Sequence, residues 1–285
     1  MSELTDLVDT LGQPEVVIPA FSSPILGMKA SEPISGTKLV LASYFEPSFV
    51  ICDVFLGADG KPTLHLNKIV SNEASAAYDG GEPQTLWPEA APGHSAPRAG
   101  TGQISIDRTK GLLLYLQNGG RQIGRYDLIS GRVLPAIGQL QERGEDFLLA
   151  WPGSLITIEK YDNCSLREYL PWVEGFELVR EVPLHASMIY GLCQVASTTL
   201  VVAPSASNVR DGPGIYEVLP NVPEGQSPLQ KVQDFPKLPP TTRALAPVYQ
   251  NKQIAGFFAA TYDFRRNDES LGTPSQLLFV PRTRN

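Results

Sequence analysis

The segment GLLLYLQNGGRQIGRYDLISGRVL, residues 111–134, decides the fold class. Two apolar-rich runs, 112–117 and 122–128, lie on either side of a turn that contains Gly119 and Gly120. A second turn around Gly131 leads into a further short run, 132–134. Short apolar runs separated by glycine turns are typical of antiparallel hairpins. The segment therefore predicts consecutive strands of one antiparallel sheet.

The first apolar run of this segment recurs along the chain, each time shortly after a small or turn residue. The copies begin at Leu39, Leu112, Leu155, Leu200 and Ile254. After the first gap their spacing is roughly 43 to 54 residues, which is the period of a four-stranded propeller blade. The first gap is longer, at roughly 73 residues, because of an Ala-, Pro-, Gly- and Glu-rich insertion at 71–100. We expect this insertion to be a long loop.

Residues 111–134 resemble the middle of a blade in quinoprotein-like, NHL-like and WD-like β-propellers. The Trp-Asp signature of WD repeats is absent from the chain. The resemblance therefore implies the β-propeller superfamily without a family inside it. We expect an all-β, five-bladed β-propeller, and the alternatives are a six-bladed propeller and a β-sandwich.

The N-terminal segment supplies the outer strand that the last repeat lacks. Only three strands are expected after Thr241, whereas residues 15–20 read as an isolated strand. Pairing this segment with the last blade would close the ring and remove an exposed sheet edge. We expect residues 1–285 to form a single propeller domain that carries the insertion at 71–100.

Charge and composition argue against several classes of function. The net charge of −7 argues against nucleic-acid binding, which usually uses a basic surface. No apolar run reaches the roughly 18 to 20 residues of a membrane span, and the N-terminus lacks a signal-like stretch. Cys52, Cys164 and Cys193 are too far apart for a zinc motif or a disulfide framework. We expect a cytoplasmic protein without membrane contact, metal or cofactor.

The expected loops are unequal on the two faces of the ring. In an up-and-down blade, the connections between successive blades share one face with the loops between the second and third strands. The segments 71–100, 135–145, 203–214 and 262–275 are long and fall on this face, which we call the long-loop face. Binding and catalysis usually reside on variable loops of a rigid scaffold, so we expect the site there.

The candidate site residues lie where inner strands begin or where second strands end on the long-loop face. The candidates for catalysis are Glu145, Asp146 and His185. The candidates for ligand binding are Arg243, Arg121, Tyr44, Tyr161, Tyr262 and Trp87. Guanidinium groups suit carboxylates or phosphates, and carboxylates or a histidine could act as acid or base.

Three functions are compatible with this arrangement. The leading hypothesis is a non-catalytic recognition or assembly module that binds a protein partner or a small-molecule ligand through the long-loop face. The alternative is a propeller enzyme, either a lactonase or hydrolase or a cyclase or isomerase, with its site at the channel mouth. The second alternative is a carbohydrate-binding lectin, against which the non-equivalent blade loops count. The sequence leaves open whether the protein is catalytic.

Overall fold

The structure is a computed structural model of the chain. It describes residues 3–18, 25–31, 37–43, 48–71, 104–107, 110–117, 122–140, 146–149, 155–159, 164–172, 175–205, 207–219, 221–223, 225–261 and 275–283.

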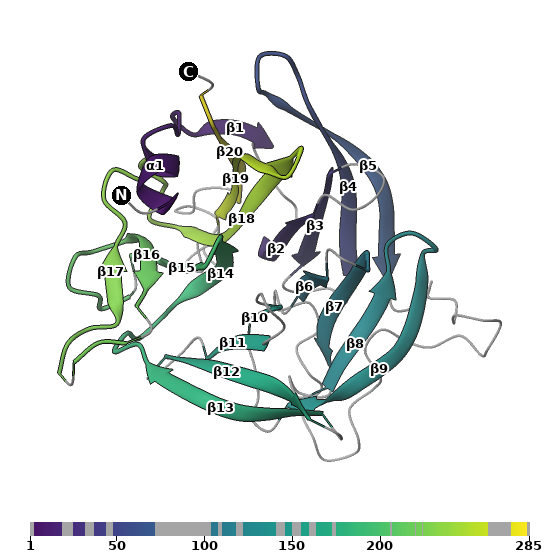
Figure 1. Cartoon of the computed structure of the whole chain (residues 1–285). Helices are drawn as coiled ribbons and strands as arrows, with labels where there is room; N and C mark the ends of the chain where they lie inside the picture. The colour runs from purple at the N-terminus through teal and green to yellow at the C-terminus, as the bar shows by residue number, and fades with distance from the viewer. Residues whose placement is uncertain are drawn as a thin grey trace, which may run out of the picture.

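The described strands form four-stranded antiparallel blades that follow one another around a ring (Figure 1). Blade I contains β2 (Ile25–Ser31), β3 (Thr37–Ser43), β4 (Ser48–Leu56) and β5 (Pro62–Ser71). Blade II contains β6 (Ile104–Asp107), β7 (Leu112–Gln117), β8 (Gln122–Asp127) and β9 (Arg132–Leu140). Blade III contains β10 (Asp146–Leu149), β11 (Leu155–Glu159), β12 (Ser165–Trp172) and β13 (Gly175–Pro183). Blade IV contains β14 (Tyr190–Val195), β15 (Thr198–Ala203), β16 (Gly214–Val218) and β17 (Leu229–Lys231).

Blade V combines the two ends of the chain. It contains β18 (Thr242–Gln250), β19 (Gln253–Thr261) and β20 (Leu277–Pro281), and its outer strand is β1 (Glu15–Ile18). β1 pairs antiparallel with β20, with Glu15 opposite Phe279. The five-bladed all-β propeller and its closure by an N-terminal strand are therefore confirmed.

Each joint between neighbouring blades has its own apolar core. Leu39 and Phe258 belong to the core between blades I and V, and Phe49 and Tyr115 belong to the core between blades I and II. Similar clusters join blades II and III, III and IV, and IV and V. The ring is therefore held mainly by burial of apolar side chains between blades.

The inner strands β6, β14 and β18 are buried on both of their faces. Every residue of β6 is buried, and so are Thr242 to Val248 in β18. Gly191 in β14 has a φ of +61°, and a Cβ there would lie 2.5 Å from Cγ2 of Val202 and 3.2 Å from the Leu245 amide nitrogen. The inner strands of blades IV and V therefore approach one another closely near the ring axis.

The outer strand of blade II is longer than the sequence suggested. The segment 135–145 was expected to be a loop, but β9 continues to Leu140, so this expectation is wrong for 135–140. The end of β9 pairs in parallel with the beginning of β13, with Gln139 opposite Gly175 and Leu140 opposite Phe176. Blades II and III are thereby joined into one eight-stranded sheet. Leu140 is 3 % exposed, and its burial against blade III explains why the strand continues.

A short helix that the sequence analysis missed packs beside blades IV and V. Helix α1 (Glu3–Val8) places Leu4, Leu7 and Val8 in the core between these two blades. After the helix, Gly12 donates its backbone N–H to the Pro281 carbonyl over 2.8 Å. The N-terminal segment is thus fastened to the end of β20 as well as paired with it. No helix in the ranges given above is long and apolar enough to cross a membrane.

Candidate functional site on the long-loop face

Three connections of blades III, IV and V meet on the long-loop face and are tied to one another by hydrogen bonds. The backbone N–H of Ser187, before β14, donates to Oδ1 of Asn208 over 2.7 Å. The N–H of Asn208 donates back to Oγ of Ser187 over 3.3 Å. On the other side, the N–H of Ser205 donates to the Pro240 carbonyl over 3.0 Å. The loop between β15 and β16 is therefore attached to both neighbouring connections.

The same loop is also held from inside the blade. The Tyr216 hydroxyl donates to the Gly212 carbonyl over 2.6 Å, and Nζ of Lys231 donates to the Asp211 carbonyl over 2.6 Å. Val209 packs against the core between blades III and IV. Side chains of β16 and β17 therefore hold the backbone of this loop at Gly212 and Asp211.

His185 lies on this face as the sequence predicted. Its side chain is exposed, whereas the flanking Leu184 and Ala186 are buried. Its φ of +51° is a left-handed conformation, in which histidine is one of the more frequent non-glycine residues. Asn208 and the exposed charged pair Arg210 and Asp211 lie in the neighbouring loop. The Ser187–Asn208 bonds hold the backbones of these two segments next to one another.

Arg243 lies at the start of β18, but it is 4 % exposed rather than open to solvent. Its guanidinium carbon is 5.2 Å from the ring centroid of Tyr190, and Nη1 donates to the Thr242 carbonyl over 3.3 Å. A cation over an aromatic face is stabilised by the ring quadrupole. The arrangement joins the starts of two inner strands, and a role of Arg243 in ligand binding stays a prediction.

A small pocket opens between blades IV and V beside these loops. It is lined by Pro204, Pro213, Pro239, Pro240 and Thr242, among others. Its volume of about 20 Å³ admits on the order of one water molecule. The prolines restrict the backbone conformation of these walls, because the φ angle of proline is fixed. The pocket is thus a shallow and stiff depression.

The remaining predicted site residues cannot be placed at this site. Asp146 begins β10, but its side chain is outside the described residues, and so are all atoms of Glu145, Arg121, Tyr44, Tyr161, Tyr262 and Trp87. Among the described residues, no group of three or more His, Cys, Asp or Glu side chains could hold a metal ion. From the predicted set, the described side chains are those of His185, in the connection before β14, and Arg243, at the start of β18.

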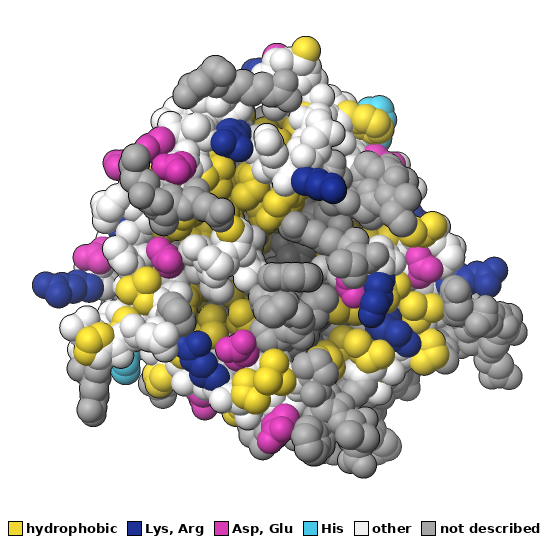
Figure 2. Space-filling model, in the orientation of Figure 1, with side chains coloured by type: hydrophobic (Ala, Val, Ile, Leu, Met, Phe, Trp, Pro, Cys, Tyr) yellow, Lys and Arg dark blue, Asp and Glu magenta, His cyan; other side chains and the backbone are white. Residues whose placement is uncertain are grey.

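Sequence reasoning missed the two residues that organise this face. Asn208 has a short amide side chain, which commonly forms hydrogen bonds with nearby loop backbone. This property could have identified it from the sequence. Tyr190 begins the inner strand of blade IV, and Arg243 lies at the start of the inner strand of blade V. Their matching positions in neighbouring blades could have predicted their contact. On the face that Figure 2 shows, basic and acidic side chains of the described residues are interspersed rather than gathered by sign.

Comparisons with known proteins give similar folds at low sequence identity. No family model matches the chain, and no curated protein sequence matches it. The PQQ-bound aldose sugar dehydrogenase of Streptomyces coelicolor is 11% identical with a TM-score of 0.43, over 94% of this chain and 98% of that one. The Pan2 WD40 domain of Neurospora crassa is 8% identical with a TM-score of 0.44, over 96% of each chain.

A third similar structure is a Bacteroides caccae protein of unknown function, which is 12% identical with a TM-score of 0.48. The match covers 92% of this chain and 79% of that one. These likenesses are too distant to carry an argument about function. The order of the strands and the closure of blade V identify the chain as a five-bladed β-propeller.

Proposed function

We propose that the protein is a non-catalytic recognition or assembly module that binds a protein partner through its long-loop face. The observation that carries this proposal is the reciprocal hydrogen-bond pair between Ser187 and Asn208, together with the Ser205–Pro240 bond. These bonds combine the connections of three blades into one surface. A surface that is already ordered loses less conformational entropy when a partner binds, so more of its contact energy remains as affinity.

The shape and chemistry of this surface suit contact with a protein better than enclosure of a small molecule. The proline-lined pocket has a volume of only about 20 Å³, whereas small-molecule sites usually enclose on the order of 300 Å³ or more. Exposed His185, Arg210 and Asp211 provide polar groups of both signs, as in the rim of many protein interfaces. The enzyme and lectin alternatives stay predictions, because Glu145 and the side chain of Asp146 are outside the described residues.

Site-specific photo-crosslinking tests this proposal. A photoreactive phenylalanine analogue replaces Arg210 on the long-loop face, and in a matched variant it replaces Ser130. Ser130 is exposed in the turn between β8 and β9, on the opposite face. Both proteins are expressed in cells that naturally make the protein and are irradiated. We expect a discrete crosslinked partner from position 210 and none from position 130.

A further substitution links the partner to the ordered loop. Asn208→Ala removes the acceptor for Ser187 and should reduce the crosslink from position 210 severalfold, while thermal unfolding stays within a few degrees of the parent. Absence of any crosslink from position 210, or the same products from both positions, would contradict recognition through this face.

A further inference from the structure

The β4–β5 hairpin of blade I extends beyond the part of that blade which blade II covers (Figure 1). Phe49 and Val70 are buried in the core shared with blade II. Farther along, Lys68 reaches blade II at the edge, where its Nζ lies 3.5 Å from the Gly131 carbonyl. Residues between Lys68 and the tip of the hairpin lie past this contact. Among the described residues, those of blade II do not cover this side of the hairpin beyond Lys68.

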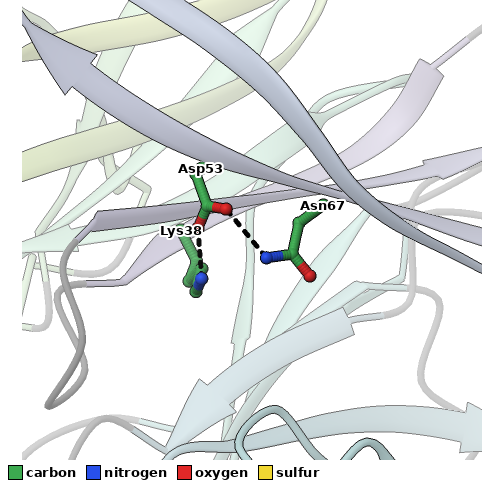
Figure 3. A network of polar contacts seen from close by, with 3 residues as sticks. All are labelled: Lys38, Asp53 and Asn67. Atoms are coloured by element: carbon green, nitrogen blue, oxygen red, sulfur yellow. Dashed lines mark hydrogen bonds and ion pairs between the residues drawn. The ribbon is translucent and has the colours of Figure 1, made fainter.

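A polar network crosses three strands on this open side. Lys38 of β3 forms an ion pair and hydrogen bond with Oδ1 of Asp53 on β4. Nδ2 of Asn67 on β5 donates to Oδ2 of the same carboxylate over 2.8 Å. Figure 3 shows that the amide oxygen of Asn67 points away from Asp53. The amide oxygen of the exposed Asn67 and further lone pairs of Asp53 can take other partners, whereas the Lys38 side chain is only 12 % exposed.

An exposed aromatic pair continues the same side of the hairpin. His65 lies directly opposite Asp53 in the strand register, and its ring centroid is 5.0 Å from that of Phe55. Phe55 follows Asp53 by two positions on β4, so both side chains lie on one face. Phe55 is 56 % exposed, so much of its ring is available for contact. The flat apolar ring of Phe55 therefore lies next to the hydrogen-bond donors and acceptors of the polar network.

We propose that Lys38, Asp53, Phe55, His65 and Asn67 form a binding site for a neutral saccharide. The C–H face of a pyranose is apolar and packs on an aromatic ring, while its hydroxyl groups both donate and accept hydrogen bonds. The ion pair leaves no net charge on Lys38 and Asp53 together. An anionic ligand would be repelled by Asp53 and a cationic one by Lys38, so a neutral polyhydroxyl ligand complements the site best. The site lies on blade I and does not depend on recognition through the long-loop face.

The test uses the full chain, fluorescently labelled, on an array of neutral oligosaccharides built from glucose, galactose, mannose and N-acetylglucosamine. Sialylated and sulfated oligosaccharides and arrayed peptides are included for comparison. We expect one or more neutral saccharides to bind. Calorimetric titration with the best of them should show affinity losses of at least about tenfold in Phe55→Ala and in Asn67→Ala.

Two control variants make the result specific. Ile129 is also a large exposed apolar residue, at 62 % exposure, but it lies in the turn of blade II, so Ile129→Ala should keep the parent affinity. Asn208→Ala on the long-loop face should keep it as well. Failure of every neutral saccharide to bind, binding of only charged glycans or peptides, or equal affinity of Phe55→Ala and the parent in folded proteins would overturn the proposal.

Discussion

Backbone pairing joins distant parts of the chain at two places in the ring, and these two joints differ in extent. In blade V, β1 pairs with β20, and further bonds extend the contact. Arg282 forms a bridge with Leu11, and the N–H of Thr283 donates to the Thr10 carbonyl over 2.7 Å. Between blades II and III, the pairing of β9 with β13 covers only Gln139 with Gly175 and Leu140 with Phe176.

This difference indicates that the pairing of β1 with β20 closes the ring, whereas the pairing of β9 with β13 only adds a contact between complete blades. Without β1, blade V would lack its outer strand, and the edge of β20 would be unpaired. Blades II and III each have four strands of their own, so the contact between β9 and β13 adds to sheets that are already complete. We therefore expect stability to depend far more on the N-terminal segment than on the parallel contact.

Removal of residues 1–18 should have the largest effect. It exposes the edge of β20 and removes Leu4, Leu7 and Val8 from the core between blades IV and V. We expect the free energy of unfolding to fall by at least about 4 kcal/mol, measured by urea denaturation, with aggregation visible by light scattering. A synthetic peptide of residues 1–18 should restore part of the loss.

The matched control for this truncation is Val16→Ala in the full chain. Val16 is in β1 but is 55 % exposed, so its truncation should change stability by only about 0.5 kcal/mol. An equal urea midpoint for the truncated and full chains would show that the ring does not depend on this closure.

Gly124→Ala tests the joint between blades I and II, which is held mainly by side-chain packing. A Cβ at Gly124 would lie 2.4 Å from Cζ of Tyr115, which is buried between blades I and II. We expect a loss of about 3 kcal/mol in urea denaturation, because the ring of Tyr115 must move within a packed core. Gly60→Ala is the control: nothing lies within 4 Å of the added atom, and only the φ of +78° is unfavourable, so about 1 kcal/mol should be lost. Equal losses in both variants would contradict the packing explanation.

Leu140→Ala tests the short joint between blades II and III. Leu140 is 3 % exposed and packs in the same core as Tyr169, so we expect a loss of about 2 kcal/mol. Hydrogen exchange followed by mass spectrometry should show faster exchange in segments 139–140 and 175–176, while β20 stays protected. Leu170→Ala, at a side chain that is 47 % exposed, should leave both segments unchanged. Simultaneous loss of protection in β20 would mean that the two joints open together.

Asp53→Asn should have the smallest effect, because the contacts it alters, with Lys38 and Asn67, lie inside a single blade. Burial works to raise the pKa of Asp53, but hydrogen bonds from Lys38 and Asn67, with the nearby charges of Lys38 and His65, hold it below its ordinary value of 3.8. A lowered folded-state pKa means that the stabilisation is present above this ordinary value and is lost as the pH falls through the folded pKa.

At pH 7 we therefore expect Asp53→Asn to cost less than about 1 kcal/mol, since the carboxylate is partly exposed. The difference between parent and variant should shrink as the pH falls below 3.8, measured by urea denaturation at each pH. A difference that stayed constant over this range would argue against a stabilising role of the ionised carboxylate.

The repeating part of this architecture was predictable from the sequence, and the joints were predictable only in part. The runs at Leu112 and Leu200 are second strands of their blades, because local apolar patterning with flanking turns specifies them. Pairing of residues 15–18 with β20 followed from the missing strand. The extension of β9 to Leu140 could not be predicted from the sequence, because Pro135 indicated a loop and the stabilising contact comes from blade III.

The site was less predictable than the fold for a similar reason. Arg243 was expected near the channel mouth from its place at a strand start, but its burial depends on Tyr190 of the preceding blade. The ordered long-loop face depends on bonds between Ser187 and Asn208, which belong to different connections. Helix α1 had a readable signal in the spacing of Leu4, Leu7, Val8 and Leu11, which repeats at helical intervals.

Closure by β1 also sets the order in which this protein can be completed during synthesis. The chain leaves the ribosome from its N-terminus, and domains fold as their segments become available. Ile18 emerges well before its partner Leu277. Until then the edge of β1 has no native partner, and the core that α1 shares with blades IV and V is incomplete. Blades I to IV can form before β20 is synthesised, whereas the ring can close only after β20 has emerged.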